Sequence, residues 1–175
     1  CTPLEWLPGL FGFASTLNIP IFASVFGEQS LAALEAVNCP AYKIASFELN
    51  DTNLIKIVAA KNKPMVLSTG VATEQEIDRA IITMEEYYND MYIIMHCVSK
   101  YPASLKEMQL SKITELGRLY DDPIGFSDHT MTNSAAKIAV TLGATVIEKH
   151  LTLSKTSEDS KFSYTPIEFK GFVCD

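Results

Sequence analysis

The sequence predicts an α/β protein that forms part of a parallel TIM barrel, the (β/α)₈ fold. Six short apolar runs, rich in β-branched residues, alternate with helical patterns, and this alternation is typical of a parallel sheet. Each run is apolar until its C-terminal end and then becomes polar, as expected where barrel strands meet at one mouth. A doubly wound open sheet is the structural alternative. It concentrates its ligands at one switch point, and no glycine-rich dinucleotide motif follows the first run.

The predicted strands are Ile19–Ser24, Ala41–Ser46, Pro64–Thr69, Met91–Cys97, Ile124–His129 and Thr145–His150. A complete barrel of about 250 residues uses about 31 residues for each βα unit. At that rate the 175 residues hold between about five and six units. We therefore expect one incomplete TIM-barrel domain over residues 1–175, with strands three to eight present and the first two βα units missing.

Helical patterns fill the gaps between these strands. The expected helices cover residues 3–17, 28–37, 52–61, 73–88, 110–120 and 132–142, with a last short helix opening at 165. Asp51 is placed to cap the third helix, and Thr73-Glu74-Gln75-Glu76 is a capping box that opens the fourth. Gly143 is placed to end the sixth helix in the left-handed conformation, and Pro166 occupies the first position of the last. The first helix is interrupted by Pro8 and Gly9.

Composition excludes several classes of partner. A net charge of −7 and a pI near 5.0 argue against nucleic acid and anionic membrane surfaces, because both require a basic face. The longest apolar runs are too short to span a bilayer. The four cysteines are widely spaced without a C-x-x-C motif, so we expect free thiols and a cytoplasmic location. The start at Cys1-Thr2-Pro3, without Met or a signal pattern, indicates an internal start.

Two histidines mark the ends of the last two strands. His129 and His150 each follow an apolar run, so parallel strands would present both imidazoles to one pocket. Neutral imidazole is a good ligand for a divalent metal, and the flanking Asp128 and Glu148 could fix the tautomers or hold bound water. The alternative is a pair of structural histidines, because this spacing alone makes no metal motif.

Lys43 lies inside an apolar strand, where a lysine is costly unless it is paired. One interpretation is a pocket cation for a carboxylate or phosphate. The other is a lysine in a salt bridge, with Glu48 or Glu148 as the partner.

Several long motifs resemble the N-acetylneuraminate (sialic acid) synthase family, which includes legionaminic, pseudaminic and spore-coat polysaccharide synthases. The resemblance covers nearly the whole chain. It is carried by Ala41-Tyr42-Lys43-Ile44-Ala45-Ser46-Phe47-Glu48, Lys63-Pro64-Met65-Val66-Leu67-Ser68-Thr69-Gly70, His96-Cys97-Val98-Ser99-Lys100-Tyr101-Pro102-Ala103, Ile124-Gly125-Phe126-Ser127-Asp128-His129-Thr130, Glu148-Lys149-His150 and Phe162-Ser163.

This resemblance implies an enzyme that condenses phosphoenolpyruvate with an open-chain N-acetylated amino sugar, such as N-acetylmannosamine. The products would be a nine-carbon 2-keto sugar acid and phosphate. It implies a divalent metal, Mn²⁺ or Mg²⁺, held by His129 and His150, and a homodimer in the full-length form. Glu48 and Lys43 match catalytic positions. The implied substrate-binding residues are Ser24, Phe26, Lys43, Ser46, Ser68, Ser99, Tyr101 and Asp159.

The sequence departs from the family pattern at two places. Ser24-Val25-Phe26-Gly27 stands where the family has Ser-Pro-Phe-Asp, and Ser157-Glu158-Asp159 stands where it has Gly-Pro-Asp. Ser46-Phe47-Glu48 is closer to pseudaminic-type members, whereas the motif from His96 to Tyr101 is closer to sialic and spore-coat types. The identity of the amino sugar therefore stays open.

Two other functions are compatible with the residues. The chain could be a non-catalytic fragment or pseudoenzyme that keeps a metal or sugar-phosphate site, or a different enolpyruvate or aldolase-type barrel enzyme. The first two family strands, which supply a glutamate and a lysine, and the antifreeze-like domain are not in the sequence. We therefore expect the chain alone to be inactive and to associate through its open strand edges.

Overall fold

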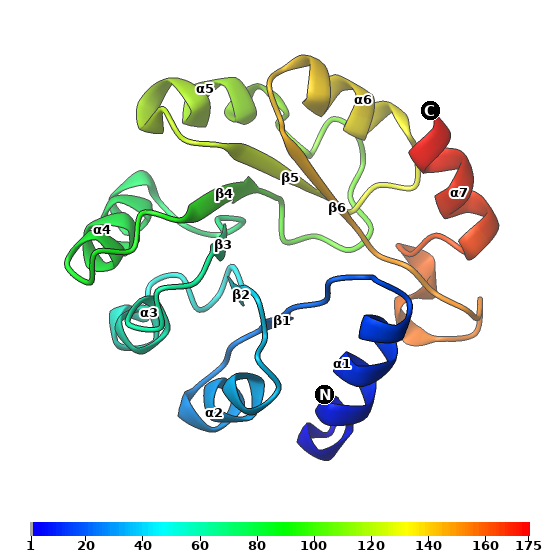
Figure 1. The fold of residues 1–175 in the computed structure, drawn as a ribbon. Helices are drawn as coiled ribbons and strands as arrows, with labels where there is room; N and C mark the ends of the chain where they lie inside the picture. The colour runs from blue at the N-terminus through cyan, green and yellow to red at the C-terminus, as the bar shows by residue number, and fades with distance from the viewer. Residues whose placement is uncertain (1) are drawn as a thin grey trace. The chain divides into compact units, whose positions relative to one another are not determined.

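Strand and helix alternate along the chain in the predicted order (Figure 1). The computed structural model describes residues 2–175, which divide into two compact units. The first unit extends to Leu67 and includes Ala72–Tyr92, and the second comprises Ser68–Val71 and Ile93–Asp175.

The first unit contains three parallel strands and the helices that follow them. Its elements are η1 (Leu4–Trp6), α1 (Leu7–Thr16), β1 (Ala23–Ser24), α2 (Glu28–Ala36), β2 (Tyr42–Ile44), α3 (Thr52–Ala59), β3 (Met65–Ser68, whose last residue belongs to the second unit) and α4 (Glu74–Glu85). Strand β2 pairs with β1 on one side and with β3 on the other, both in parallel. The strand order therefore follows the chain, as in successive βα units.

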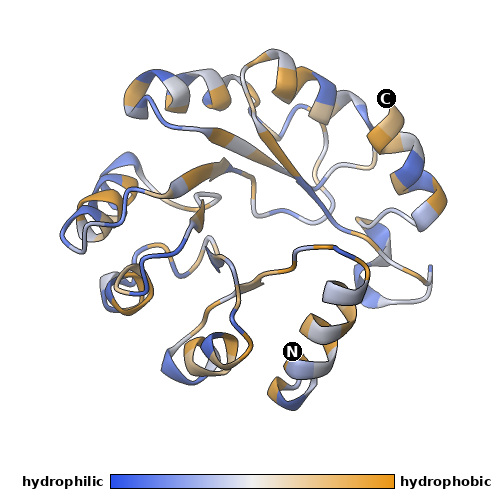
Figure 2. Ribbon diagram, viewed as in Figure 1, coloured by the Kyte–Doolittle hydropathy of each residue, from blue (hydrophilic) through white to orange (hydrophobic). Residues whose placement is uncertain are grey.

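The second unit repeats this pattern. Its elements are β4 (Tyr92–His96, whose first residue belongs to the first unit), α5 (Ser111–Tyr120), β5 (Ile124–Asp128), α6 (Ser134–Thr141), β6 (Val146–Lys149), η2 (Glu158–Lys161) and α7 (Pro166–Cys174). Strand β5 lies between β4 and β6, again in parallel. Along β6 the residues change from hydrophobic to hydrophilic (Figure 2), which is the predicted change at a strand tip.

All six predicted strands form, and each is shorter than expected. The largest difference is β1, which covers Ala23–Ser24 where the sequence predicted Ile19–Ser24. A strand is defined by its ladder of hydrogen bonds, and the ladder with β2 begins only at the Ala23 to Tyr42 pair. Apolar character therefore located the strand correctly but could not show where pairing begins.

The predicted helix caps are confirmed. The Asp51 side chain accepts a hydrogen bond from the Leu54 amide at 3.0 Å, and Thr73 and Glu76 form the expected capping box. Gly143 has a φ of +106°, the conformation that a non-glycine residue rarely adopts. Pro8 does not interrupt the first helix, because it lies in the first turn of α1, where its missing N–H has no intrahelical partner. The last helix is longer than the short one predicted.

A buried asparagine ties together three segments of the first unit. Asn89 is 0% exposed. Its side-chain amide donates to the carbonyls of Ala59 and Lys63 at 3.3 and 3.0 Å, and its oxygen accepts from the Met91 amide at 3.1 Å. These bonds join the end of α3 to the segments that lead into β3 and β4, and the Ala59 carbonyl also accepts from the Asn62 amide at 2.9 Å.

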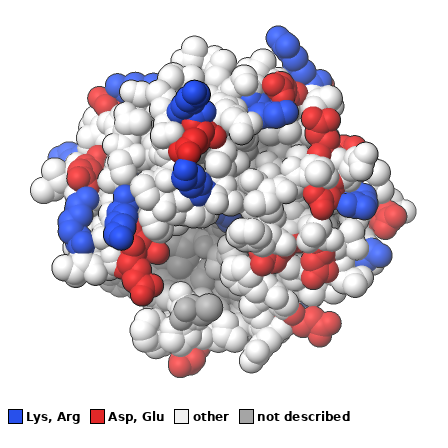
Figure 3. Space-filling model, turned by 180° about the vertical axis from the view of Figure 1, so that it is seen from behind, with Lys and Arg blue, Asp and Glu red and all other residues white. Residues whose placement is uncertain are grey.

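The surface agrees with the acidic composition. On the face shown in Figure 3, basic and acidic side chains are interspersed among the described residues and no extended basic patch is seen. Within residues 2–175, none of the helices has the length and apolar character required to cross a bilayer.

Gly125 permits close packing between β4 and β5 in the second unit. A Cβ built on this glycine would lie 2.1 Å from the Met95 sulfur and 3.2 Å from the Val146 carbonyl oxygen. Met95 is only 1% exposed, so its side chain has little room to move away.

We expect Gly125→Ala to lower the free energy of unfolding by about 1–3 kcal/mol, because the added methyl overpacks a filled core. Gly117→Ala in α5 is the matched control. Its Cβ would meet Ile124 at 3.7 Å, an ordinary contact, and alanine favours a helix by up to about 1 kcal/mol. Urea unfolding of both variants measures the difference. Equal stability of the two would contradict the packing argument.

Candidate functional site

The predicted site residues lie at strand ends in both units. In the first unit, Ser24 ends β1 and pairs in register with Lys43 on β2. Ser46 and Glu48 follow β2 in a turn closed by the Glu48 amide and the Ala45 carbonyl, 3.0 Å apart. Phe26 is 64% exposed in the loop after β1.

In the second unit, the predicted residues follow four successive strands. They are Ser68 at the end of β3, Ser99 and Tyr101 after β4, His129 after β5, and His150 after β6, with Asp159 farther along in η2. The structure brings three of these together, because the rings of Tyr101, His129 and His150 are in contact.

The two histidines form the centre of this group. Their ring centroids are 5.4 Å apart, with 59° between the ring planes. A metal ion bonded to one nitrogen of each ring at about 2.0–2.1 Å requires centroids closer than roughly 6.5 Å. The separation of His129 and His150 is therefore compatible with one shared ion.

His129 is held in one tautomer. It is 3% exposed, and its Nδ1 lies 2.8 Å from the Val98 carbonyl oxygen. A carbonyl can only accept, so Nδ1 carries the proton and Nε2 keeps a free lone pair. Burial lowers the pKa of His129, and the nearby His150 lowers it further, whereas the bond to Val98 opposes the shift. The ring is therefore neutral at pH 7, as a metal ligand must be.

Aromatic side chains surround the imidazoles. The Tyr101 ring lies 4.1 Å from that of His129, tilted by 35°, and Phe162 meets His150 edge-on at 5.0 Å and 88°. Tyr101 and Phe162 also contact each other at 5.1 Å. Burial raises the pKa of the Tyr101 hydroxyl, so this group stays a neutral hydrogen-bond donor. The motif Phe162-Ser163 was noticed in the sequence, but its contact with His150 was not predicted.

The loop after β4 is anchored on His129. In addition to the Nδ1 contact with Val98, the carbonyl of His129 accepts from the Ala103 amide at 3.0 Å. Farther along the loop, His96 Nε2 lies 2.7 Å from the Met108 carbonyl. These bonds fix the segment that carries Ser99 and Tyr101.

The hydroxyl of Ser68 is the exception to complete hydrogen bonding. Ser68 is 3% exposed, and its Oγ is a buried side-chain atom without a hydrogen-bond partner among residues 2–175. An unpaired buried hydroxyl costs about 1–3 kcal/mol, and such a group is often satisfied by a ligand. This supports the prediction that Ser68 binds substrate.

The role first considered for Asp128 requires correction, whereas that of Glu148 stays a prediction. Asp128 does not fix the tautomer of His129, because the Val98 carbonyl occupies Nδ1. The Asp128 carboxylate pairs with Lys149 instead, at 2.9 Å. Glu148 accepts from the Ser127 hydroxyl at 3.0 Å. Alternation explains the difference, because Asp128 and His129 point to opposite faces of β5.

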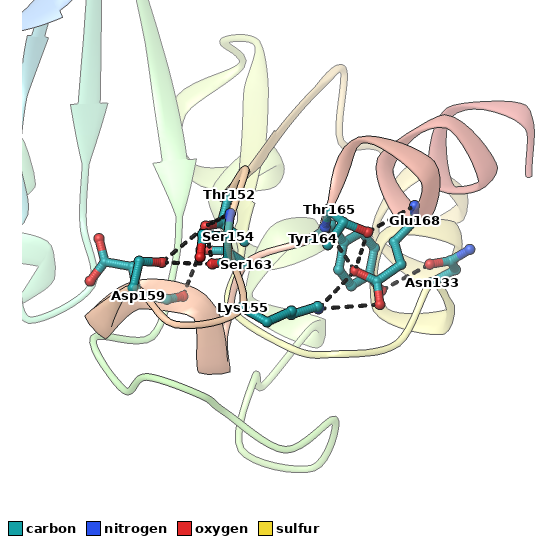
Figure 4. Close-up of polar contacts among 10 residues, drawn as sticks. Asn133, Thr152, Ser154, Lys155, Asp159, Ser163, Tyr164, Thr165 and Glu168 are labelled. Atoms are coloured by element: carbon teal, nitrogen blue, oxygen red, sulfur yellow. Dashed lines mark hydrogen bonds and ion pairs between the residues drawn. The ribbon is translucent and has the colours of Figure 1, made fainter.

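The loop after β6 returns to its own strand (Figure 4). The Tyr164 amide donates to the His150 carbonyl at 2.9 Å, and the Thr152 amide donates to the Tyr164 carbonyl at 2.8 Å. Inside the loop, the Ser163 hydroxyl donates to the Asp159 carbonyl at 2.7 Å. The Asp159 carboxylate is exposed and points away from this cluster.

Two histidines are the candidate metal ligands among the described residues. Within residues 2–175 no group of three or more His, Cys, Asp and Glu side chains could hold an ion together. The donor set fits a divalent metal with open positions, since two imidazoles leave room for water and substrate oxygens. The metal stays a prediction.

Comparison with known proteins decides the family. The model of the NeuB family matches residues 1–175. The chain belongs to the NeuB family. It is 42% identical to the pseudaminic acid synthase of Helicobacter pylori over 98% of the chain and 50% of that protein. It spans about half the length of the curated relatives it matches, and these relatives include named synthases, so the family is one of enzymes.

Solved structures confirm the predicted fold class. The crystal structure of spore coat polysaccharide biosynthesis protein SpsE from Bacillus subtilis matches with a TM-score of 0.94 at 37% identity, over 98% of this chain and 49% of that one. The DAHP synthase of Thermotoga maritima matches with a TM-score of 0.87 over 99% of this chain and 54% of that one, at 17% identity, and shows the fold alone. The described residues 2–175 thus form part of a TIM barrel.

His96, the third histidine of the chain, is buried, and its protonation should make the stability of the protein depend on pH. His96 is 6% exposed, and burial lowers its pKa below the ordinary 6.5. Its ring stacks on Phe126 and faces Lys112 and Glu115. The unfolded chain therefore takes up a proton near pH 6.5 that folded His96 accepts only at lower pH.

We expect the free energy of unfolding to fall as the pH drops from about 7 to 5.5, because the unfolded state then binds more protons. His129 contributes with the same sign. His96→Gln keeps a donor for the Met108 carbonyl but does not titrate, so its pH dependence should be shallower. Urea midpoints at the two pH values measure the slope. The same slope in both proteins would show that His96 is not buried in its neutral form.

Proposed function

We propose that this chain forms part of a synthase that condenses phosphoenolpyruvate with an N-acetylated amino sugar. The products are a nine-carbon 2-keto sugar acid of the sialic acid type and phosphate. The observation that carries the proposal is the pair of imidazoles of His129 and His150, 5.4 Å apart, at the ends of two neighbouring parallel strands. Similarity to a protein named pseudaminic acid synthase favours an amino sugar of the pseudaminic type.

The proposed metal is Mn²⁺ or Mg²⁺, held by His129 and His150. Such an ion supplies Lewis acidity toward a carbonyl oxygen. The protein's own contribution is to present Nε2 of His129, whose Nδ1 proton is committed to the Val98 carbonyl. Tyr101 and Phe162 limit the access of water to these nitrogens from the side on which their rings lie.

Phosphoenolpyruvate is an anion and requires donors and cations. Lys43, Ser46, Ser68 and Ser99 are the residues we assign to it, and Ser24, Phe26, Tyr101 and Asp159 to the rest of the substrate-binding surface. The buried hydroxyl of Ser68, without a protein partner, supports this role most directly. A charge-assisted bond from Lys43 would contribute about 1.5–3 kcal/mol.

The proposed reaction forms one carbon–carbon bond. C3 of phosphoenolpyruvate attacks the aldehyde carbon of the open-chain sugar, and the aldehyde oxygen becomes a hydroxyl. The oxygen of a water molecule adds at C2, and phosphate leaves to give the 2-keto acid. Glu48, half-buried in the turn after β2, is our candidate to move a proton or to stabilise positive charge near C2. The homodimer and the cytoplasmic location expected from the sequence stay predictions.

The first test is metal binding by the 175-residue chain, followed by the electron paramagnetic resonance of free Mn²⁺. We expect His150→Ala to weaken binding by at least about a hundredfold, since half of the protein ligands are lost. His96→Gln is the matched control, because His96 donates to the Met108 carbonyl and is no part of the pair. Equal binding by the His150→Ala variant and the parent would reject the metal site.

The second test concerns Lys43. We expect Lys43→Ala to weaken phosphoenolpyruvate binding about 10- to 100-fold, which corresponds to the charge-assisted contact above. Isothermal titration with phosphoenolpyruvate in the presence of Mn²⁺ measures the effect. Lys106→Ala, which removes an exposed lysine from the loop after β4, should bind as the parent does. An unchanged affinity in the Lys43→Ala variant would remove this lysine from the substrate site.

A further inference from the structure

The last residues of β5 and β6 form an ion pair that solvent does not reach. Lys149 Nζ lies 2.9 Å from Asp128 Oδ2, and the two side chains are 1% and 0% exposed. Asp128 and Lys149 are partners in the register of the two strands. Each is followed directly by a histidine, so the pair lies on one face of the sheet and His129 and His150 on the other.

The pair holds the backbone on both sides of His129. Asp128 Oδ1 accepts from the Thr130 amide at 2.8 Å, and Lys149 donates to the Thr130 carbonyl. The amide and the carbonyl of Thr130 are thus both bonded to the Asp128–Lys149 ion pair. His129, between Asp128 and Thr130, cannot change its backbone conformation without breaking these contacts.

The same lysine connects to His150 through Tyr164. Lys149 Nζ lies 4.3 Å from the centre of the Tyr164 ring, a cation–π contact. The Tyr164 amide donates to the His150 carbonyl at 2.9 Å, and its hydroxyl donates to Asn133 Oδ1 at 2.9 Å. The Asp128–Lys149 pair is therefore connected to the backbone beside His129 through Thr130, and to the backbone of His150 through Tyr164.

Stability alone does not explain such a pair. Burying two charges has a desolvation cost that often equals or exceeds their attraction, and an apolar pair of similar volume is frequently as stable or more so. Burial accordingly lowers the pKa of Lys149, against the effect of Asp128. What an apolar pair cannot supply is the set of directed bonds to Thr130.

We propose that Asp128 and Lys149 are positioning residues, which fix the separation and orientation of the His129 and His150 imidazoles for one divalent ion. This inference depends on the metal site proposed above. Loss of the groups that orient metal ligands typically weakens metal binding about 10- to 100-fold. The effect of the pair on metal binding should be separable from its effect on folding.

The test compares the parent chain with the double variant Asp128→Leu/Lys149→Met, using Mn²⁺ alone as the probe. The double variant removes both charges and so avoids their desolvation cost, but it leaves the buried Thr130 amide and carbonyl without these partners, so we expect a folded protein with a modestly lower midpoint of thermal unfolding. Its dissociation constant for Mn²⁺ should nevertheless increase at least about tenfold. Lys112→Met, which breaks an exposed pair with Glu115, is the control and should bind within about twofold of the parent.

A double variant that is folded and binds Mn²⁺ as tightly as the parent overturns the proposal, because the pair would then serve stability alone. If the double variant does not fold, Asp128→Asn decides by the same measurement. The asparagine oxygen can still accept from Thr130, but the charge that holds Lys149 is lost, and we expect about tenfold weaker Mn²⁺ binding. Unchanged binding by Asp128→Asn would overturn the proposal. A parent chain that does not bind Mn²⁺, or one in which His150→Ala binds equally, overturns the metal site itself.

Discussion

The ion pair between Asp128 and Lys149 is the contact on which the tips of β5 and β6 depend. Its exclusion from water makes its geometry strict, because a buried charge that loses its partner costs about 3–5 kcal/mol. The pair therefore permits little variation in the register of the two strands at this point. That register places His129 beside His150, and the rings of Tyr101 and Phe162 pack on the two imidazoles.

Alternation along a strand separates the two tasks of these residues. In Asp128-His129 and Lys149-His150, the two members of each dipeptide point to opposite faces of the sheet. The charged members bond to each other, whereas His129 keeps its Nε2 available, because Nδ1 is bonded to the Val98 carbonyl. His129 is further held by the Val98 carbonyl and the Ala103 amide. The candidate site is thus held by the side-chain ion pair together with backbone groups of the loop after β4.

The sequence predicted the βα order, the six strands and the caps at Asp51, Thr73 and Gly143, because these depend on local patterns that recur in many proteins. It also placed His129 and His150 at adjacent strand ends. It could not predict that Lys149, and not the histidine, would be the partner of Asp128, since that depends on which residues are opposite each other in the register. The contact of Phe162 with His150 was missed for a similar reason. It arises from a loop that returns to its own strand through Tyr164, and no periodic pattern indicates such a return.

Ser68 and Asp128 are two buried polar residues of the second unit that differ in their hydrogen bonding. Asp128 is buried and fully bonded within the protein, through Lys149 and the Thr130 amide. Ser68 is buried with an oxygen that none of the described residues satisfies. A protein gains nothing in stability from an unsatisfied hydroxyl in its interior, whereas a site that must bind and release an anion needs a donor that no internal group occupies. The presence or absence of an internal hydrogen-bond partner, more than polarity itself, therefore distinguishes the candidate ligand-binding Ser68 from the structural Asp128.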